Sequence, residues 1–276
     1  MRVHFIGIGG IGLSALARFL NFDGHSVSGS DMKSSSITKE LEKEGIKVSC
    51  PQEAKNISDD LDLVIYSAAV TDENPELIEA RLKQIRTLSR KEALPIIIGD
   101  KKNYCVAGAH GKSTTTAILA TIWQSSALIG AISKEFGSNF RYVDKTVAFE
   151  ADESDASFLL SNPYCAIVTN AEPEHMEYYH YDYDKFYESY ETFLSLAKKR
   201  VVNGEDKDIQ KLKIEDATYL YPSKDIKNLC YTLKDGQPCT KFDLKDYGTF
   251  EVWGFGFHIA SNASLAIMAA LNELDI

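Results

Sequence analysis

The stretch CVAGAHGKSTTT, at residues 105–116, constrains the fold of this chain most. An apolar run at 104–107 predicts a short buried strand, and 112–123 have the apolar spacing of a helix. A strand, a glycine-containing turn and a helix that begins with Lys and Ser form an arrangement that binds phosphate. Backbone N–H groups and the helix N-terminus point at the anion there. The stretch therefore predicts a phosphate-binding turn in an α/β fold.

The predicted turn offers specific groups to a nucleotide. Lys112 can reach the terminal phosphates, and the Ser113 hydroxyl can bind Mg²⁺. The match is incomplete, because Val106 stands where the full P-loop pattern has glycine. The alternative is an ordinary glycine-rich turn between a strand and a helix, with a lysine on the surface. The candidate nucleotide-binding residues here are Gly108, Ala109, His110, Gly111, Lys112, Ser113 and Thr114.

A second glycine motif lies near the N-terminus and matches G-x-G-x-x-G. It follows a predicted strand at 3–7 and precedes residues with helical apolar spacing. Asp31 ends the next predicted strand, about 20 residues further on, where Rossmann folds place a carboxylate that binds ribose. Ser67 follows a third strand at 63–66. The motif residues are Gly7, Gly9, Gly10, Ile11 and Gly12. The pattern predicts a site for a dinucleotide or a related pyrophosphate.

Strand and helix patterns alternate as far as residue 98, and the polar, turn-rich residues 99–103 follow. We therefore expect two domains: a Rossmann-like domain at 1–100 and a P-loop-type α/β domain at 101–276. Short alternating segments then predict antiparallel strands added to the parallel sheet of the second domain. These segments are 218–221, 230–233, 240–244 and 249–253.

Carboxylates gather after a predicted strand at 145–150. Four of the six residues 150–155 are acidic, including Glu153. Two interpretations stay open: a loop that faces Mg²⁺, or a helix N-terminus enriched in acidic residues. His175 follows another predicted strand, at 166–169. It could be a metal ligand or a base, because the C-terminal ends of parallel strands meet at one edge of the sheet; a lone histidine in a loop is usually neither.

Composition excludes several classes of protein. The net charge of −10 argues against a general nucleic-acid binder. The five cysteines are scattered without a C-x-x-C pair, so neither a zinc site nor a disulfide framework is indicated. Met1 leads directly into a strand pattern rather than a signal peptide, and no apolar run has membrane-spanning length. We therefore expect a cytoplasmic protein that is not inserted in a membrane.

Taken together, the motifs resemble those of the Mur ligases, and within that family the branch that adds L-alanine. The segments EADESDASFL and VTNAEPEHMEYY are the most specific part of the match, because generic P-loop proteins lack them. Five stretches carry the resemblance in the family's order, at 4–17, 29–31, 108–116, 150–159 and 168–179.

The resemblance implies an ATP-dependent carboxylate–amine ligase of peptidoglycan synthesis. The first domain, with Gly7 to Gly12, Asp31 and Ser67, would bind UDP-N-acetylmuramate rather than NAD. The second domain would bind ATP and Mg²⁺. The reaction would run through an acyl phosphate, from which the amine of L-alanine displaces phosphate.

The resemblance also implies roles for single residues. Lys112 would hold the β- and γ-phosphates, Ser113 and Glu153 would bind one Mg²⁺, and His175 would help to bind a second. Asn262 matches a position that contacts adenine, and His258 lies beside it. The catalytic residues would therefore be Lys112, Glu153 and His175.

Some positions depart from the family pattern. Ser113 stands where Thr is usual, Glu174 where Asp is usual, and Ile259 replaces an Asn, which puts one polar adenine contact in doubt. The family's third, C-terminal domain has no counterpart before Ile276. We therefore expect a two-domain piece of a longer enzyme, which binds nucleotides without turnover on its own.

Three alternatives remain at this point. A peptide-recycling ligase would act on the same UDP-sugar and add a preformed peptide to it. An NAD-dependent oxidoreductase would use Gly7 to Gly12 and Asp31, but it leaves the second turn and the acidic segment unexplained. A P-loop binding module without ligase chemistry leaves the first domain unexplained.

Overall fold

The computed structural model describes residues 1–133, 137–143 and 146–274. Lys145, the first residue of a predicted strand, and Ile276 lie outside these residues. The chain forms two compact units. The first consists of Met1–Asp100 with Leu128–Asp144, and the second of Lys101–Ala127 with Lys145–Ile276.

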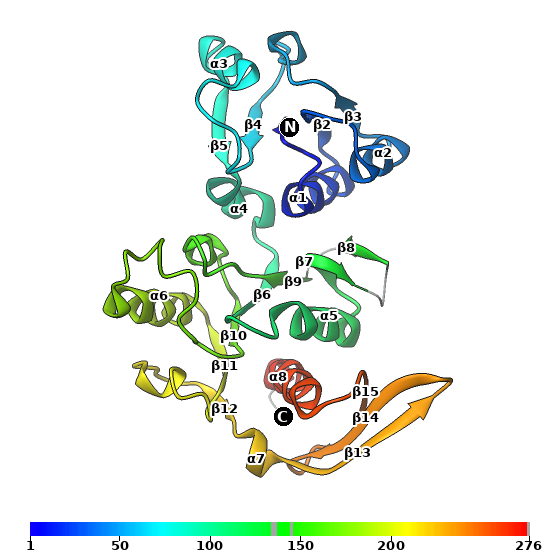
Figure 1. The fold of residues 1–276 in the computed structure, drawn as a ribbon, viewed down its shortest axis with the longest axis vertical. Coiled ribbons are helices and arrows are strands. Elements are labelled where there is room, and N and C mark those ends of the chain that lie inside the picture. The colour runs from blue at the N-terminus through cyan, green and yellow to red at the C-terminus, as the bar shows by residue number, and fades with distance from the viewer. Residues whose placement is uncertain (134–136, 144–145, 275–276) are drawn as a thin grey trace. The chain divides into compact units, whose positions relative to one another are not determined.

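The first unit is built on a parallel sheet of five strands in the order β3-β2-β1-β4-β5 (Figure 1). The strands are β1 (Arg2–Ile6), β2 (Ser26–Ser30), β3 (Lys47–Ser49), β4 (Leu63–Tyr66) and β5 (Arg86–Ser89). The helices are α1 (Ile11–Phe22), α2 (Ser36–Lys43), α3 (Pro75–Leu82) and α4 (Arg90–Ile98), with a 3-10 turn at Ala54–Asn56. Strands that alternate with helices around a parallel sheet confirm the predicted Rossmann-like fold.

Side chains cap three of these helices at their N-termini. Ser35 and Thr38 form a reciprocal capping box at α2, and Ser89 forms one with Glu92 at α4. The side chain of Asn74 accepts hydrogen bonds from two backbone N–H groups of α3. Caps satisfy N–H groups that have no partner within a helix, so they fix where each helix begins. For this reason the first residues of α2 and α4 are readable from the sequence.

A strand distant in the sequence also belongs to the first unit. β8 (Ser138–Arg141) follows β7 (Ser126–Ser133), and its Phe140 ring meets Phe19 of α1 edge to face. Asn139 donates to the carbonyl oxygen of Ile11 at 2.7 Å, and the guanidinium of Arg18 donates to the side-chain oxygen of Asn139 at 3.3 Å. Strand β8 thus packs against α1, although the sequence prediction placed these residues in the second domain.

In the second unit the parallel strands β12, β11, β10, β6 and β9 lie side by side in that order. They are β6 (Lys102–Ala107), β9 (Thr146–Glu150), β10 (Cys165–Val168), β11 (Lys199–Asn203) and β12 (Thr218–Leu220). The helices are α5 (Lys112–Trp123), α6 (Tyr183–Leu196), α7 (Pro222–Asp225) and α8 (Phe257–Glu273), with 3-10 turns at Ser157–Leu160 and Ile209–Lys211. Helices α5 and α8 pack against each other (Figure 1).

The register of the central strands fixes the position of the site. β6 lies between β9 and β10, with Val106 opposite Glu150 and Ala107 opposite Val168. All three strands run parallel, so the segments that follow them leave the sheet at one edge. The predicted phosphate turn (residues 108–111), the acidic segment (residues 150–155) and the loop with His175 therefore meet there, as the sequence predicts.

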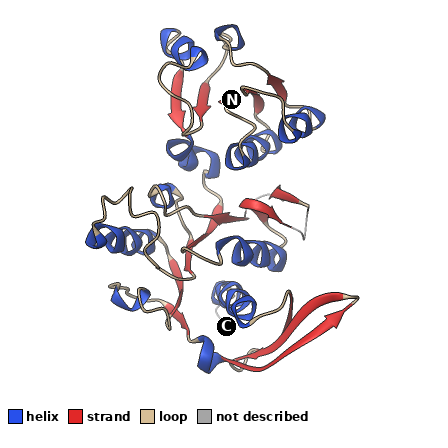
Figure 2. Cartoon of the chain, in the orientation of Figure 1, coloured by secondary structure: helices blue, strands red, loops and turns tan. Residues whose placement is uncertain are grey.

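Residues 226–253, before α8, form a separate antiparallel sheet, in which β13 and β14 make a long hairpin (Figure 2). Its strands are β13 (Ile226–Lys234), β14 (Gln237–Leu244) and β15 (Gly248–Trp253). Two details of the prediction are wrong. The three antiparallel strands form a sheet of their own and do not extend the parallel sheet. The segment 218–221 contains β12, which pairs parallel with β11. Three residues of β12 are too few for periodicity to show the strand direction. None of the described helices has the length and hydrophobicity of a membrane span.

Candidate functional site

The glycine turn of the first unit brings the predicted residues together. Gly7 has a φ of +83°, a conformation that favours glycine, and its N–H and that of Ile8 both donate to the carbonyl oxygen of Ser30 at 2.9 Å. A β-carbon on Gly7 would lie 2.8 Å from the hydroxyl oxygen of Ser67. Only glycine therefore fits between β1 and the residue that follows β4.

Asp31 holds the same turn from the end of β2. Its Oδ2 accepts the N–H of Gly9 at 2.8 Å, and a β-carbon on Gly9 would lie 2.7 Å from that oxygen. Helix α1 begins at Ile11 after Gly10, and no side chain caps it. Its first N–H groups therefore remain available for an anion, because a helix N-terminus favours negative charge. Asp31 thus holds the glycine turn before α1 through the N–H of Gly9.

Arg90 was not among the predicted site residues. A β-carbon on Gly12 would lie 3.4 Å from Nε of Arg90, so this guanidinium stands beside the first turn of α1. Arg90 is also the first residue of α4, directly after the parallel strand β5. A charged residue at the C-terminal end of a parallel strand is the sequence signal that could have identified it.

Two glycines of the phosphate turn are required by close contacts. Gly108 has a φ of +132°, and a β-carbon there would overlap the Thr169 hydroxyl and lie 2.7 Å from the carbonyl oxygen of Asn170. Gly111 has a φ of +87°, and its β-carbon would lie 2.5 Å from Oδ1 of Asn262. The turn is thus packed between the loop after β10 and helix α8.

Asn170 connects the loop after β10 to this turn. Its Oδ1 accepts the N–H of His110 at 3.1 Å, and its Nδ2 donates to the carbonyl oxygen of His110 at 2.7 Å. The hydroxyl of Thr169 donates to the same carbonyl oxygen at 2.6 Å. Sequence reasoning did not single out either residue, although both belong to the VTN motif at the end of a parallel strand.

The charged centre of the site is an ion pair between Lys112 and Glu153. Nζ of Lys112 lies 2.8 Å from Oε1 of Glu153 and donates at 2.6 Å to the carbonyl oxygen of Gly108. The side chains are 17% and 4% exposed, respectively. Oε2 of Glu153 is buried without a hydrogen-bond partner among the described residues. Burial raises the pKa of Glu153, and the nearby Lys112 ammonium opposes this rise without cancelling it.

The carboxylates of the acidic segment make different contacts. Oδ1 of Asp152 accepts the backbone N–H and the hydroxyl of Ser154, at 3.0 and 2.6 Å. Oδ1 of Asp155 accepts the N–H of Ser157 at 2.9 Å. These bonds form local turns before the 3-10 turn at Ser157–Leu160. Glu153 turns inward, and its oxygen without a partner is the group in this segment suited to a cation.

Ser113 and His175 differ in their surroundings. Ser113 is half-buried in the first turn of α5, and its hydroxyl makes no hydrogen bond within the described part of the chain. His175 is exposed with a φ of +52°, and its ring likewise forms no hydrogen bond or ion pair to a described residue. Among residues 1–133, 137–143 and 146–274, no three His, Cys, Asp or Glu side chains form a metal-binding group. The metal assignment of Ser113, Glu153 and His175 therefore stays a prediction.

A cavity of about 450 Å³ lies beside the phosphate turn within the second unit. It contains four of the predicted nucleotide-binding residues: His110, Gly111, His258 and Asn262. Residues that the sequence did not single out include Asn203, Glu205, Phe257 and Ser261. Its size is typical of small-molecule sites, which are about 300–1,000 Å³. The cavity connects the first turn of α5 to the first turns of α8.

Comparison with known proteins gives two family matches. The model for "Mur ligase family, catalytic domain" matches residues 2–102, and that for "Mur ligase middle domain" matches residues 106–270. The chain is 58% identical to the UDP-N-acetylmuramate–L-alanine ligase of Campylobacter curvus, covering 100% of this chain and 63% of that protein. It is 49% identical to the ligase of the same name from Helicobacter pylori strain P12, of which it covers 61%. The chain thus spans less than two thirds of these relatives.

Solved structures agree with these matches. The UDP-N-acetylmuramate–alanine ligase of Thermotoga maritima superimposes with a TM-score of 0.80 at 29% identity, over 100% of this chain and 66% of that one. A ligase from Neisseria meningitidis that acts on UDP-N-acetylmuramate and a tripeptide gives a TM-score of 0.78 at 21% identity, over 100% of this chain and 94% of that one. At that identity the second likeness concerns the fold alone.

Proposed function

Since this chain belongs to the Mur ligase family, we propose that it supplies the substrate-binding units of an ATP-dependent ligase. The complete protein would join L-alanine to UDP-N-acetylmuramate through an acyl phosphate, forming an amide bond. The alanine ligases at 58% and 49% identity support this reaction over the peptide-recycling alternative. The cell compartment would be the cytoplasm, which the five free cysteines also support.

The observation that carries the proposal is the Lys112–Glu153 pair behind the phosphate turn. The ammonium of Lys112 reaches the turn carbonyls and the buried carboxylate together. In this position it can stabilise negative charge on a transferred phosphoryl group, the main electrostatic task in phosphoryl transfer. An oxidoreductase that used the first glycine motif would have no use for such a pair.

Mg²⁺ fits the residues present. The buried Oε2 of Glu153 lacks a partner among the described residues, and the half-buried Ser113 hydroxyl follows Lys112 in α5. Both are hard oxygen donors of the kind that Mg²⁺ prefers, and phosphate oxygens and water would complete its coordination. When bound, the ion would neutralise charge on the β- and γ-phosphates. His175 would contribute to a second ion.

The adenine would occupy the cavity beside α8. Asn262 packs against Gly111, and His258 lies one helical turn earlier on α8. Thr114 and the turn residues from Gly108 to Gly111 would surround the phosphates. In the first unit, the glycine turn and the start of α1 would hold the pyrophosphate of the UDP-sugar, with Asp31 keeping the turn in shape.

Calorimetric titration of the parent and Lys112→Ala tests both sites. The variant should lose measurable affinity for ATP–Mg²⁺ and keep the parent's affinity for UDP-N-acetylmuramate, because the two ligands use different units. Lys185→Ala removes an exposed lysine that pairs with Asp182 and should change neither affinity. Unchanged ATP affinity in Lys112→Ala, or NAD binding in place of the UDP-sugar by the parent, would contradict the proposal.

A further inference from the structure

We propose that the first unit contains an additional binding site, for a small phosphorylated sugar or polyol. The site is a cavity of about 400 Å³ beside β1, β2 and β3, a volume within the range of about 300–1,000 Å³ that is usual for small-molecule sites. Arg2, Ser26 and Lys47, the first residues of these three strands, line it. The predicted UDP-sugar site lies at the other ends of the strands, and none of its residues lines the cavity.

The sheet presents a polar face to this cavity. Side chains of a strand alternate between the two faces of a sheet, so every second residue shares a face. On the face of the cavity, two rows of residues lie opposite each other in register: Arg2 with Ser26, and His4 with Ser28 and Lys47. The intervening residues of β1, Val3 and Phe5, are buried and apolar. Strands covered on both faces usually form continuous apolar runs, so this polar face is suited to a polar ligand rather than to a packed helix.

Buried groups hold the polar face and the segment before β4 in place. His4 is 2% exposed; its Nδ1 lies 2.9 Å from the Ser28 hydroxyl oxygen, and its Nε2 lies 3.4 Å from Oε2 of Glu76. Asn56, which lines the cavity from the segment before β4, donates to Oε1 of Glu76 at 2.6 Å. Two walls of the cavity are thus joined to one buried carboxylate, so the cavity is preformed, as is usual for small-molecule sites.

The lining carries an excess of positive charge, although the net charge of the chain is −10. Its cations are Arg2, Lys47 and Lys55, and its one carboxylate is that of Asp60. Arg2 pairs with Asp60, and Lys55 pairs with Glu53, which is not a lining residue. Lys47 is exposed and forms no ion pair within the described part of the chain. Its ammonium is therefore available to a phosphate group, with which lysine and arginine form strong charge-assisted hydrogen bonds.

The remaining polar groups indicate what the phosphate is attached to. Hydroxyl groups can donate and accept hydrogen bonds, and they line the cavity from β2, β3 and the segment before β4. They belong to Ser26, Ser28, Ser49 and Ser58. A ligand that carries several hydroxyl groups of its own can pair with such a lining, which is the property of a sugar or polyol.

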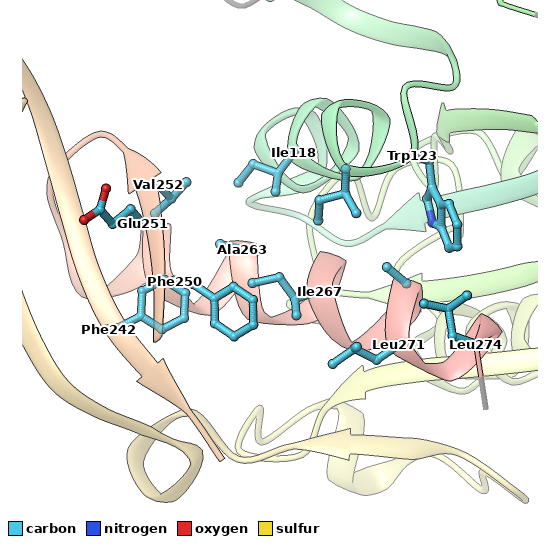
Figure 3. A pocket seen from close by; sticks show the side chains of 12 residues that line it. Ile118, Trp123, Phe242, Phe250, Glu251, Val252, Ala263, Ile267, Leu271 and Leu274 are labelled. Carbon is cyan, nitrogen blue, oxygen red and sulfur yellow. The ribbon is translucent and has the colours of Figure 1, made fainter. Parts of the chain in front are cut away.

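A cavity in the second unit shows the contrasting case of an apolar lining. It has a volume of about 390 Å³ and lies between α5, α8 and the antiparallel sheet, and Phe250 and Ile267 point into it (Figure 3). The cavity beside β1 to β3 has no Phe, Tyr or Trp among its lining residues, all of which are described. A nucleobase would find no aromatic side chain there on which to stack. The lining thus favours a phosphorylated sugar or polyol over a nucleotide.

Calorimetric titration of the whole chain with glucose 6-phosphate, inorganic phosphate and glucose tests the site. Each titration contains saturating UDP-N-acetylmuramate and the β,γ-imido analogue of ATP with Mg²⁺, so that both predicted phosphate-binding turns are occupied. Glucose 6-phosphate should bind about tenfold more tightly than inorganic phosphate, because its hydroxyl groups add hydrogen bonds. Glucose should bind at least about tenfold more weakly than glucose 6-phosphate, because it lacks the charged group.

Variants at exposed positions locate the binding. Lys47→Glu reverses the unpaired charge and should weaken glucose 6-phosphate at least about tenfold, the contribution of a hydrogen bond to a charged group. Ser26→Phe fills the cavity from the first residue of β2 and should also weaken it at least several-fold. Lys43→Glu makes the same charge change on an exposed residue of α2 outside the lining and should keep the parent's affinity. The urea midpoint of each variant shows whether it is folded.

Four results would overturn the proposal. They are no binding of glucose 6-phosphate to the parent, parent-like binding in Lys47→Glu, an equal loss of affinity in Lys43→Glu, and equal affinities of the parent for glucose 6-phosphate and inorganic phosphate. The last result would mean that the hydroxyl groups of the lining contribute nothing. Weakened binding in folded Lys47→Glu and Ser26→Phe, with parent-like binding in Lys43→Glu, supports the site.

Discussion

The ammonium of Lys112 lies 2.8 Å from one carboxylate oxygen of Glu153, while the other oxygen of Glu153 is buried without a partner in the described chain. Half of this carboxylate is therefore satisfied by the protein itself. A buried charge is stable only when it is paired and hydrogen-bonded. The pair thus links the stability of the second unit to the site where we propose that ATP–Mg²⁺ binds.

A double-mutant cycle measures this link. Lys112→Met leaves the Glu153 carboxylate buried and unpaired, and Glu153→Gln leaves Lys112 without its anion. Each change should lower the free energy of unfolding by about 2–4 kcal/mol. The double variant should lose less than the sum, with a coupling energy of about 1–3 kcal/mol. Urea denaturation of the four proteins without ligand gives these values. If the losses of the two single variants simply added up in the double variant, the contact between Lys112 and Glu153 would not contribute to stability.

The stability of Lys112→Met should depend on pH in a defined way. Burial raises the pKa of Glu153, and removal of Lys112 raises it further, so folded Lys112→Met binds a proton more readily than its unfolded chain. The stability of Lys112→Met is therefore highest below the ordinary pKa of 4.5, and it is lost as the pH rises through the higher folded-state pKa. The deficit of Lys112→Met relative to the parent should shrink on acidification. Urea titrations at several pH values check this, and a constant deficit would contradict it.

A second buried carboxylate, Glu76, should behave in the opposite way. Burial alone would raise its pKa, but hydrogen bonds from His4, Ser30 and Asn56 together outweigh burial and lower it. The contribution of Glu76 to stability is complete above its ordinary pKa of 4.5 and is lost as the pH falls through the lower folded-state value. Glu76→Gln should therefore cost about 2–4 kcal/mol at neutral pH and progressively less below pH 4.5.

Urea denaturation of the parent and of Glu76→Gln, at neutral and at acidic pH, measures this difference in the free energy of unfolding. Glu42→Gln is the matched control, because Glu42 is an exposed glutamate on α2 in the same unit. It should stay within about 0.5 kcal/mol of the parent at every pH. A Glu76→Gln deficit that grows on acidification would contradict the assignment of Glu76 as an ionised hydrogen-bond acceptor.

Much of the fold could be read from the sequence because its signals are local. Capping residues mark α2 and α4, and each glycine turn follows an apolar strand. The position of the site followed from one general rule, that parallel strands end at the same edge. By contrast, the packing of Phe140 on Phe19 joins residues far apart in the chain, and no local pattern indicates it.

Within the site, residue type was more predictable than residue role. The sequence shows three carboxylates directly after β9, but only the folded backbone decides that Glu153 turns toward Lys112 while Asp152 and Asp155 form local turns. Asn170 binds both the N–H and the carbonyl group of His110, a role that depends on the pairing of β6 and β10. Such roles depend on which residues of neighbouring strands lie opposite each other, and no local pattern in the sequence shows this pairing across parallel strands.

The glycines of the second unit allow a controlled comparison of backbone strain and crowding. Gly236 and Gly108 both have positive φ, but a β-carbon on Gly236 would meet nothing within 4 Å. Gly236→Ala should cost about 1–2 kcal/mol and leave ATP affinity unchanged. Gly108→Ala adds a clash with Thr169 and with the backbone of Asn170, so it should also lower the affinity for ATP–Mg²⁺ at least tenfold. Equal ATP affinities in the two variants would contradict a role for Gly108 in the shape of the turn.

The last prediction concerns Tyr179, which joins the loop after β10 to the acidic segment. Its hydroxyl donates to the backbone carbonyl oxygen of Glu153 at 2.6 Å, and the Ser189 hydroxyl lies 3.4 Å from it. Burial raises the pKa of Tyr179 to about 12, so the hydroxyl stays protonated and able to donate near neutral pH. Tyr179 therefore fixes the backbone that directs the Glu153 carboxylate.

Tyr179→Phe removes only this hydroxyl. It leaves the Glu153 carbonyl oxygen without its donor and should lower the free energy of unfolding by about 1–2 kcal/mol. Because a displaced Glu153 would hold Mg²⁺ less well, ATP affinity should fall several-fold in the presence of Mn²⁺ or Mg²⁺ and change little in EDTA. Tyr181→Phe, on an exposed tyrosine of the same loop, should match the parent in both conditions. An equal fall in ATP affinity with and without metal would indicate a general loss of structure, and would contradict a specific effect of Tyr179 on the metal-binding side of the site.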